Sequence, residues 1–252
     1  MMRRTVAIVL LGLFGAAKMP LEQSLDAAQK AAQLRTVPLN LDMRERLSQM
    51  GFLAALSGFR SALAAFLWIE AHNAWERTEW GRMSGLFDTV TTLQPRSKLY
   101  WDLAAWHMAW NASVAALDDK SQPSEALRIR NQRQYFKLGR DYLERGIKNN
   151  PDSAFLHERL GILLRDKLDD HCGAAAAFLK ASQLPDAPAY IARFAGYELS
   201  KCPGREREAY DLLKKLYEKG DKERKPTLMT TLQELEKKLD IPLQDRINSP
   251  QP

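Results

Sequence analysis

Side chains with acid–base capacity occur inside the most apolar part of this sequence, between residues 58 and 117. A carboxylate and an imidazole held together away from water can act as general acid and base, so such a set could form a catalytic site. The simpler interpretation is a buried, hydrogen-bonded network that fixes the register of neighbouring helices, with some members exposed to solvent. The candidate residues are Arg60, Glu70, His72, Asp88 and His107.

Motifs that hold metals or nucleotides are missing from the sequence. It contains no His-x3-His, Glu-x2-His or Cys-x2-Cys spacing, which are typical of metal ligands. It also lacks the G-x-S-x-G nucleophile motif, the Walker loop and the G-x-G-x-x-G fingerprint. We therefore expect no metal, no cofactor and no enzymatic activity.

All six tryptophans fall in the same apolar stretch. Trp106 and Trp110 are four residues apart and therefore share one face of a helix, as do His107 and Asn111. One interpretation is an aromatic groove that grips a peptide, a sugar or a lipid, because aromatic residues are enriched at binding hot spots. The other is packing between the first helices. The candidate partner-binding residues are Trp68, Trp75, Trp80, Trp101, Trp106, Trp110 and Asn111.

A basic face lies on the helix expected over residues 123–149. Such a face could bind anionic lipid or nucleic acid. Acidic residues gather towards the C-terminal half of this helix, where they can pair with cations four residues away, so a solvated face is the preferred interpretation. We do not expect a nucleic-acid partner. The residues are Arg128, Arg130, Arg133, Lys137 and Arg140.

The two cysteines, Cys172 and Cys202, each fall between two expected helices. Stacked helices lie about 8–10 Å apart, whereas a disulfide needs Cα atoms within about 7 Å. The two loops also differ in length. The sequence therefore leaves a disulfide between Cys172 and Cys202 open.

Helices must position all of these residues. Apolar residues recur every three or four positions, helix-forming residues dominate, and strand patterns with period two are nearly absent. The fold class is therefore all-α. The expected helices cover 44–57, 59–78, 80–94, 98–117, 123–149, 153–168, 172–184, 187–200, 204–219 and 226–239.

A spacing repeats along the chain. Ala174-x3-Phe178-x2-Ala181 precedes Pro185, 34 residues after Pro151, and the next unit follows at 35 residues. A small residue in the first helix of a pair, such as Gly161, lets the second helix cross closely. Together with Leu160, these residues resemble the tetratricopeptide repeat (TPR) family, whose period is 34 residues. The resemblance covers about 62–220 and implies a right-handed α–α superhelix, a helical solenoid with degenerate repeats; we expect this repeat domain to span 44–240. The unit between Pro95 and Pro151 is about 22 residues longer than the family's period of 34.

The first residues are typical of a targeting segment. Arg3 and Arg4 precede the apolar run 6–17, and Gly15, Ala16 and Ala17 supply a small-residue cleavage site. We expect 1–17 to be a signal peptide, with an uncleaved membrane anchor as the alternative. We expect a linker over 18–43 and a flexible tail over 241–252.

The apolar stretch 50–69 contains one charge, Arg60, and is a candidate membrane span. A charge in the middle of a span costs about 2.5–3.5 kcal/mol, so two packed helices meeting near Gly58 are preferred. The sequence thus predicts an exported, periplasmic or cell-envelope scaffold that binds a protein or peptide partner. The alternative is a membrane-anchored accessory subunit that contacts the membrane through 1–17.

Overall fold

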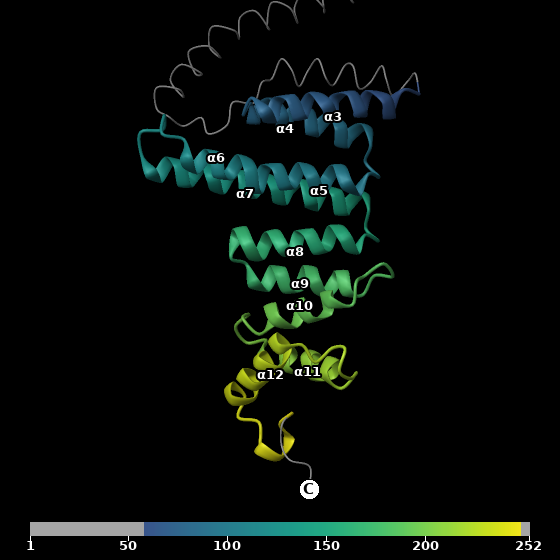
Figure 1. Ribbon diagram of the computed structural model, residues 1–252, viewed down its shortest axis with the longest axis vertical. Helices are drawn as coiled ribbons and strands as arrows, with labels where there is room; N and C mark the ends of the chain where they lie inside the picture. Colours follow the sequence, from purple (N-terminus) through teal and green to yellow (C-terminus); the bar gives the residue numbers. More distant parts are fainter. Residues whose placement is uncertain (1–57, 248–252) are drawn as a thin grey trace, which may run out of the picture. The chain divides into compact units, whose positions relative to one another are not determined.

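The computed structural model describes residues 58–247, and Figure 1 shows these residues as a succession of helices. All the regular structure in this range is helical, so the all-α prediction is confirmed. Two short segments are not α-helical, because η1 is a π-helix and η2 is a 3-10 helix. The elements are α3 (Arg60–Glu76), α4 (Trp80–Leu93), α5 (Lys98–Trp106), η1 (His107–Ala112), α6 (Ser113–Asp118), α7 (Glu125–Asn149), α8 (Ala154–Leu168), α9 (His171–Ser182), α10 (Tyr190–Leu199), α11 (Glu206–Tyr217), α12 (Pro226–Lys238) and η2 (Leu243–Asp245).

The helices pack in chain order, each against the next, as expected for a helical solenoid (Figure 1). The predicted boundaries agree with the observed ones to within a few residues. The predicted helix 98–117 is a single rod made of α5, η1 and α6, with a π-helical segment in its middle. The predicted helix 44–57, the signal peptide 1–17 and the linker 18–43 lie outside the described residues.

Close helix crossings occur where the repeat pattern places a small residue. An added Cβ at Gly161 of α8 would lie 2.6 Å from Cε1 of Phe178 in α9, so only glycine allows this contact. In α10, Gly196 meets Leu213 of α11 in the same way. Phe178 and Leu213 are completely buried. The spacing of small and large residues read from the sequence therefore corresponds to real crossings within helix pairs.

The overlong repeat unit is accommodated by longer helices. The α7 helix has 25 residues, whereas α8, which follows it, has 15. Near the C-terminal end of α8, the Nζ atom of Lys167 lies 5.7 Å from the ring centroid of Phe136 in α7. The N-terminal half of α7 and its partner α6 project past that end (Figure 1). The extra residues thus form an overhang on an existing helix pair.

Asp186, in the loop between α9 and α10, links three parts of the solenoid. Its Oδ1 accepts a hydrogen bond of 3.1 Å from the backbone N–H of Ala154 at the start of α8. Its Oδ2 lies 3.4 Å from Nζ of Lys98 at the start of α5. The free N–H groups at a helix N-terminus favour a negative charge, so Asp186 supplements the N-cap Ser153, whose side chain accepts from the Leu156 N–H.

Up to residue 247, the C-terminal segment is packed on the helices, in contrast to the flexible tail expected over 241–252. Ile241 is buried against α12, and the Glu236 carboxylate accepts a 2.8 Å hydrogen bond from the backbone N–H of Ile247. The Tyr217 hydroxyl donates to the carbonyl of Ile247. These contacts fix the segment onto the last helices.

The candidate membrane span 50–69 ends inside α3, where Ala64 and Leu67 are buried and α3 packs on α4. Within residues 58–247 no helix has the length and apolarity needed to cross a membrane.

Candidate functional site

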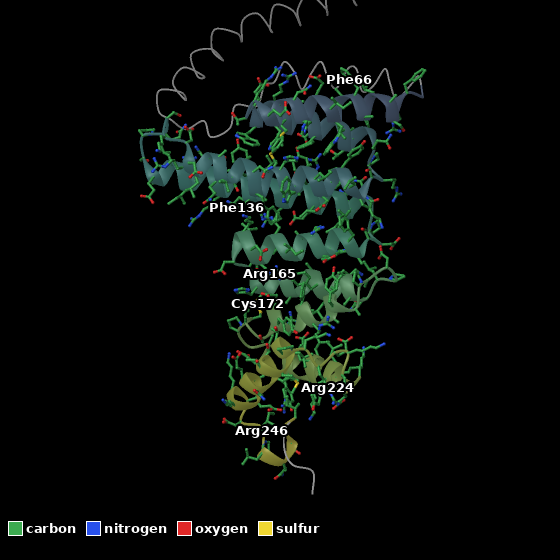
Figure 2. The ribbon with its side chains drawn as sticks, in the orientation of Figure 1. Phe66, Phe136, Arg165, Cys172, Arg224 and Arg246 are labelled. Carbon is green, nitrogen blue, oxygen red and sulfur yellow. A yellow bond between two sulfur atoms is a disulfide. The ribbon has the colours of Figure 1, made fainter. Side chains whose placement is uncertain are left out.

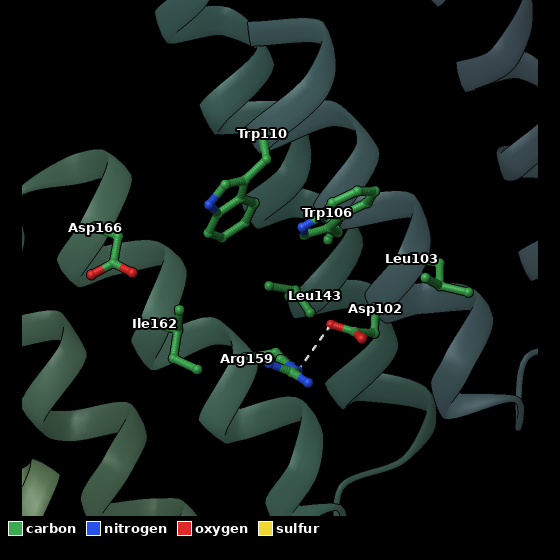
Figure 3. Close-up of a pocket in the computed structure, with 9 residues that line it drawn as sticks. Asp102, Leu103, Trp106, Trp110, Leu143, Arg159, Ile162 and Asp166 are labelled. Carbon is green, nitrogen blue, oxygen red and sulfur yellow. Dashed lines mark ion pairs between the residues drawn. The ribbon is translucent and has the colours of Figure 1, made fainter. Parts of the chain in front are cut away.

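A groove of about 440 Å³ lies between the α5–η1 rod and α8, the first helices of two successive pairs (Figure 3). Its walls combine indole rings, aliphatic side chains and charged groups. We call it the tryptophan groove. The residues that line it are Asp102, Leu103, Ala105, Trp106, Trp110, Leu143, Arg159, Ile162 and Asp166.

The two tryptophans of the groove come from the predicted i, i+4 pair. Trp106 ends α5 and is 43% exposed, which is high for so large an apolar side chain. Trp110 lies in η1, and the Nζ atom of Lys167 lies 4.9 Å from the centroid of the Trp110 ring. Burial lowers the pKa of Lys167. Isolated π-helical turns inside α-helices are rare and are frequent at functional sites, and this one begins directly after Trp106 and contains Trp110.

An ion pair crosses the groove between α5 and α8. The Nε atom of Arg159 lies 3.3 Å from Oδ1 of Asp102 (Figure 3), although the two are not aligned for a hydrogen bond. Burial raises the pKa of Asp102, and the neighbouring Arg159 guanidinium opposes that rise. The guanidinium also lies 5.0 Å from the ring centroid of Phe155. The groove therefore offers a carboxylate and a guanidinium whose hydrogen-bonding capacity is not fully used within residues 58–247.

The remaining tryptophans contribute to packing. Trp101 is only 2% exposed, and its Nε1–H donates a 2.9 Å hydrogen bond to the carbonyl of Pro95. Trp68 contacts the rings of Phe87 and Tyr100, with centroids 5.4 and 5.3 Å away. The prediction that all six tryptophans form a partner-binding surface is wrong for Trp101, which belongs to the core. Trp68, Trp75 and Trp80 are half-buried outside the groove, and their part in partner binding stays a prediction.

The predicted buried polar network is not a single network. Arg60 and His72 are exposed, and His72 lies 3.5 Å from Glu76, its neighbour one turn later. Glu70 and Asp88 are half-buried and pair with different arginines. Arg82 lies 3.1 Å from Glu70, and Arg145 lies 2.9 Å from Asp88. Because the five candidates point to separate partners, they do not converge on a reaction centre.

His107 is the member of that set with an unusual environment. Its ring packs among Trp75, Phe87 and Trp106, with centroids 5.0 to 5.8 Å away. Its Nδ1 lies 3.0 Å from Nδ2 of Asn111, one helical turn later, so the amide donates to the imidazole. Burial, with a smaller contribution from His72, lowers the pKa of His107 to about 4. A neutral His107 thus supports the back of the tryptophan groove.

The predicted basic face lies on α7. Arg130, Arg133 and Lys137 are exposed, while Arg128 and Arg140 are half-buried. This face is separate from the tryptophan groove, because the two share no lining residue.

The structure joins Cys172 and Cys202 by a disulfide, with Cα atoms 5.1 Å apart. Cys172 lies in the first turn of α9 (Figure 2), and Cys202 lies just after α10. In the residue before Cys172, Nδ1 of His171 lies 2.6 Å from the buried carboxylate of Glu198. The bond ties the start of α9 to the end of α10.

Sequence reasoning missed the residues that α8 and α7 bring to the groove. Arg159, Ile162 and Asp166 follow one another at i, i+3 and i+7 on α8, so they share one face of that helix. Asp102 precedes Trp106 by four residues in the same manner. These spacings were visible in the sequence, but nothing in the sequence showed that the two helix faces oppose each other. Within residues 58–247 no three His, Cys, Asp or Glu side chains are placed to hold a metal ion.

Known proteins give little beyond the fold. No family model and no curated protein matches the sequence. Among solved structures, TTC0263, a thermophilic TPR protein of Thermus thermophilus, is similar at 16% identity and a TM-score of 0.39, over 76% of this chain and 98% of that one. A MamA RS-1 ArsTM double mutant is similar at 15% identity and a TM-score of 0.32, over 79% and 97% of the two chains.

Proposed function

We propose that this protein is a non-enzymatic scaffold that binds a segment of a partner protein in the tryptophan groove. The observation that carries the proposal is the exposed indole of Trp106 beside Trp110 in a groove between successive helix pairs. Helical-repeat proteins present extended surfaces of this kind to their partners.

The groove has the composition of a binding hot spot. Tryptophan and arginine dominate the energetics of protein interfaces, and truncation of one such residue commonly costs about 2 kcal/mol or more. Covering Trp106 would remove apolar surface from water. The Asp102–Arg159 pair at the side of the indoles would orient a polar group of the partner. Leu103 and Ile162 complete an apolar floor on the two opposing helices.

The test is a site-specific photocrosslink in the native cells. A photoreactive residue in place of Leu103, in the groove, is expected to form a protein adduct. The same residue in place of Gln233, exposed on α12, serves as the position control. Trp106→Ala should abolish the adduct at Leu103. Phe66→Ala, which removes an aromatic side chain 54% exposed on α3, should leave it unchanged. An adduct that survives Trp106→Ala would contradict a partner site in the groove.

We further propose that the scaffold acts in the cell envelope. Two features support this location. The Cys172–Cys202 disulfide is of the kind that persists in oxidising compartments, and residues 1–17 read as a signal peptide or anchor. Intact mass and fractionation of the native protein test it. A chain starting at Lys18 in the periplasmic fraction is the expected result. A full-length chain in the membrane fraction would favour the anchored accessory subunit, and a full-length chain in the cytoplasm would refute the proposed location.

A further inference from the structure

We propose that the N-terminal half of α7 is a second docking surface, which binds an acidic segment of a protein. The surface is formed by Arg130, Arg133 and Lys137, and we call it the basic ridge. It is independent of the tryptophan groove. The ridge lies in the N-terminal half of α7, and its three cations are exposed in the part of the chain that the structure describes.

Among residues 58–247, the arginines of α7 are paired with carboxylates in the C-terminal half of the helix only. In the C-terminal half, Arg140 lies 3.4 Å from Glu144, and Arg145 pairs with Asp141 at 3.2 Å and with Asp88 at 2.9 Å. Carboxylates of the same chain therefore neutralise the arginines of this half, which leaves no strong excess of positive charge there.

The ridge has no such balance. Arg130, Arg133 and Lys137 are exposed, and no carboxylate of residues 58–247 pairs with any of them. They lie at i, i+3 and i+7, and therefore on one face of α7 over about 10 Å at 1.5 Å per residue. Ala126, Ile129 and Gln134 complete the same face, which lines a hollow of about 450 Å³. Three unneutralised cations along one hollow complement a row of carboxylates.

The shape and composition of the ridge favour a peptide over a membrane surface. Helices that lie in a lipid interface insert large apolar side chains beside their cations. Of the large apolar side chains exposed among residues 58–247, none belongs to α7. The arginine guanidinium, in contrast, matches a carboxylate in a two-point hydrogen-bonded geometry. The hollow that this face of α7 lines would accept the side chains of an extended acidic segment.

The experiment measures binding of a fluorescein-labelled oligoglutamate peptide to the full-length protein by fluorescence anisotropy. The expected result is saturable binding that weakens with added salt, because exposed charge pairs are screened. The triple variant Arg130→Gln, Arg133→Gln, Lys137→Gln should bind about tenfold more weakly, since each exposed ion pair contributes a factor of roughly two to three.

A matched variant removes the same charge elsewhere. Lys215→Gln, Lys219→Gln and Lys222→Gln neutralise three exposed lysines around the end of α11, and this triple variant should bind as the wild type does. Trp106→Ala should also leave peptide binding unchanged, which separates this proposal from the one for the groove. Absence of peptide binding, or an equal loss in the two triple variants, would overturn the proposal. Sedimentation with phosphatidylglycerol vesicles without peptide binding would identify the ridge as a lipid surface and would also overturn it.

Discussion

Replacing Gly139 by alanine tests how tightly the α5–η1 rod crosses α7. An added Cβ at this position would lie 2.7 Å from Cβ of Ala109 and 2.9 Å from the carbonyl oxygen of Ala105. Both alanines are buried, at 0% and 1% exposure. A Cβ atom and a backbone oxygen cannot rotate away, so the two helices must move apart. The site matters for function because the same stretch of the rod carries Trp106 and Trp110.

The expected magnitude follows from two opposing effects. Overpacking a well-filled core costs about 1–3 kcal/mol, and two immovable contacts put Gly139→Ala towards the upper end. Alanine is favoured over glycine in a helix by about 1 kcal/mol. The variant should therefore lose about 1–2 kcal/mol of stability.

Gly85 of α4 provides the matched control. It is also helical and buried, but an added Cβ would meet no atom within 4 Å. Gly85→Ala should therefore gain about 0.5–1 kcal/mol from helix propensity alone. Urea unfolding followed by circular dichroism compares the two variants, whose stabilities should change in opposite directions and differ by about 1.5–3 kcal/mol. If Gly139→Ala unfolded at the same urea concentration as Gly85→Ala, or at a higher one, the close crossing would be disproved.

Three further perturbations have expected outcomes. Cys172→Ser removes a disulfide that spans 30 residues of sequence, and on the loop-entropy estimate it should destabilise the protein by about 3–4 kcal/mol, seen as a lower midpoint of thermal unfolding. The pKa of His107 is lowered to about 4 in the folded protein, so the unfolded chain binds the proton at a higher pH than the folded protein does. The free energy of unfolding should therefore fall as the pH drops from about 6.5 to about 4. His107→Gln should reduce this pH dependence, measured by urea titrations at each pH. Asp186→Ala removes the acceptor of the Ala154 N–H at the start of α8, although Ser153 still caps the helix, and should cost about 0.5–1 kcal/mol in the same assay.

Each of these outcomes has its own control. Cys202→Ser, and the double serine variant, should be as unstable as Cys172→Ser, and a much larger effect in the double variant would argue against the disulfide as the cause. An NMR titration of His107 with a midpoint near 6.5 would contradict its shielded environment. Asp152→Ala, at an exposed residue near the start of α8, should leave stability unchanged, and a loss equal to that of Asp186→Ala would remove the capping argument.

Local sequence determined the helices. Their existence and limits depend on apolar spacing, proline and glycine positions and capping residues, all of which act over a few neighbouring positions. Gly161 and Phe178 illustrate this, because a small residue and a large one at repeat spacing were sufficient to predict a close crossing that the structure contains. The spacing of Trp106 and Trp110 likewise predicted a shared helix face.

Tertiary structure decided which faces meet. Trp101 and Trp106 are equally apolar and only five residues apart, yet Trp101 is 2% exposed and Trp106 is 43% exposed. Five residues place the two indoles about 140° apart around α5, and the packing of α7 on the rod decides which of the two faces is buried: Gly146 of α7 lies against Trp101. Arg145 pairs with Asp88 from 57 residues away, which separates Asp88 from the histidines expected beside it.

The disulfide and the overhang also show the difference between what local sequence determines and what the tertiary structure decides. The sequence placed Cys172 and Cys202 between helices but could not give their separation, because a few ångströms in the stacking of α9 and α10 decide whether a bond forms. It also showed a repeat unit about 22 residues too long without showing where the extra residues go. The sequence alone determined the helices and their apolar faces, because these depend on neighbouring residues. The groove and the disulfide depend on distances between helices, and the exposure of the basic ridge depends on what packs against α7; only the folded structure fixes these.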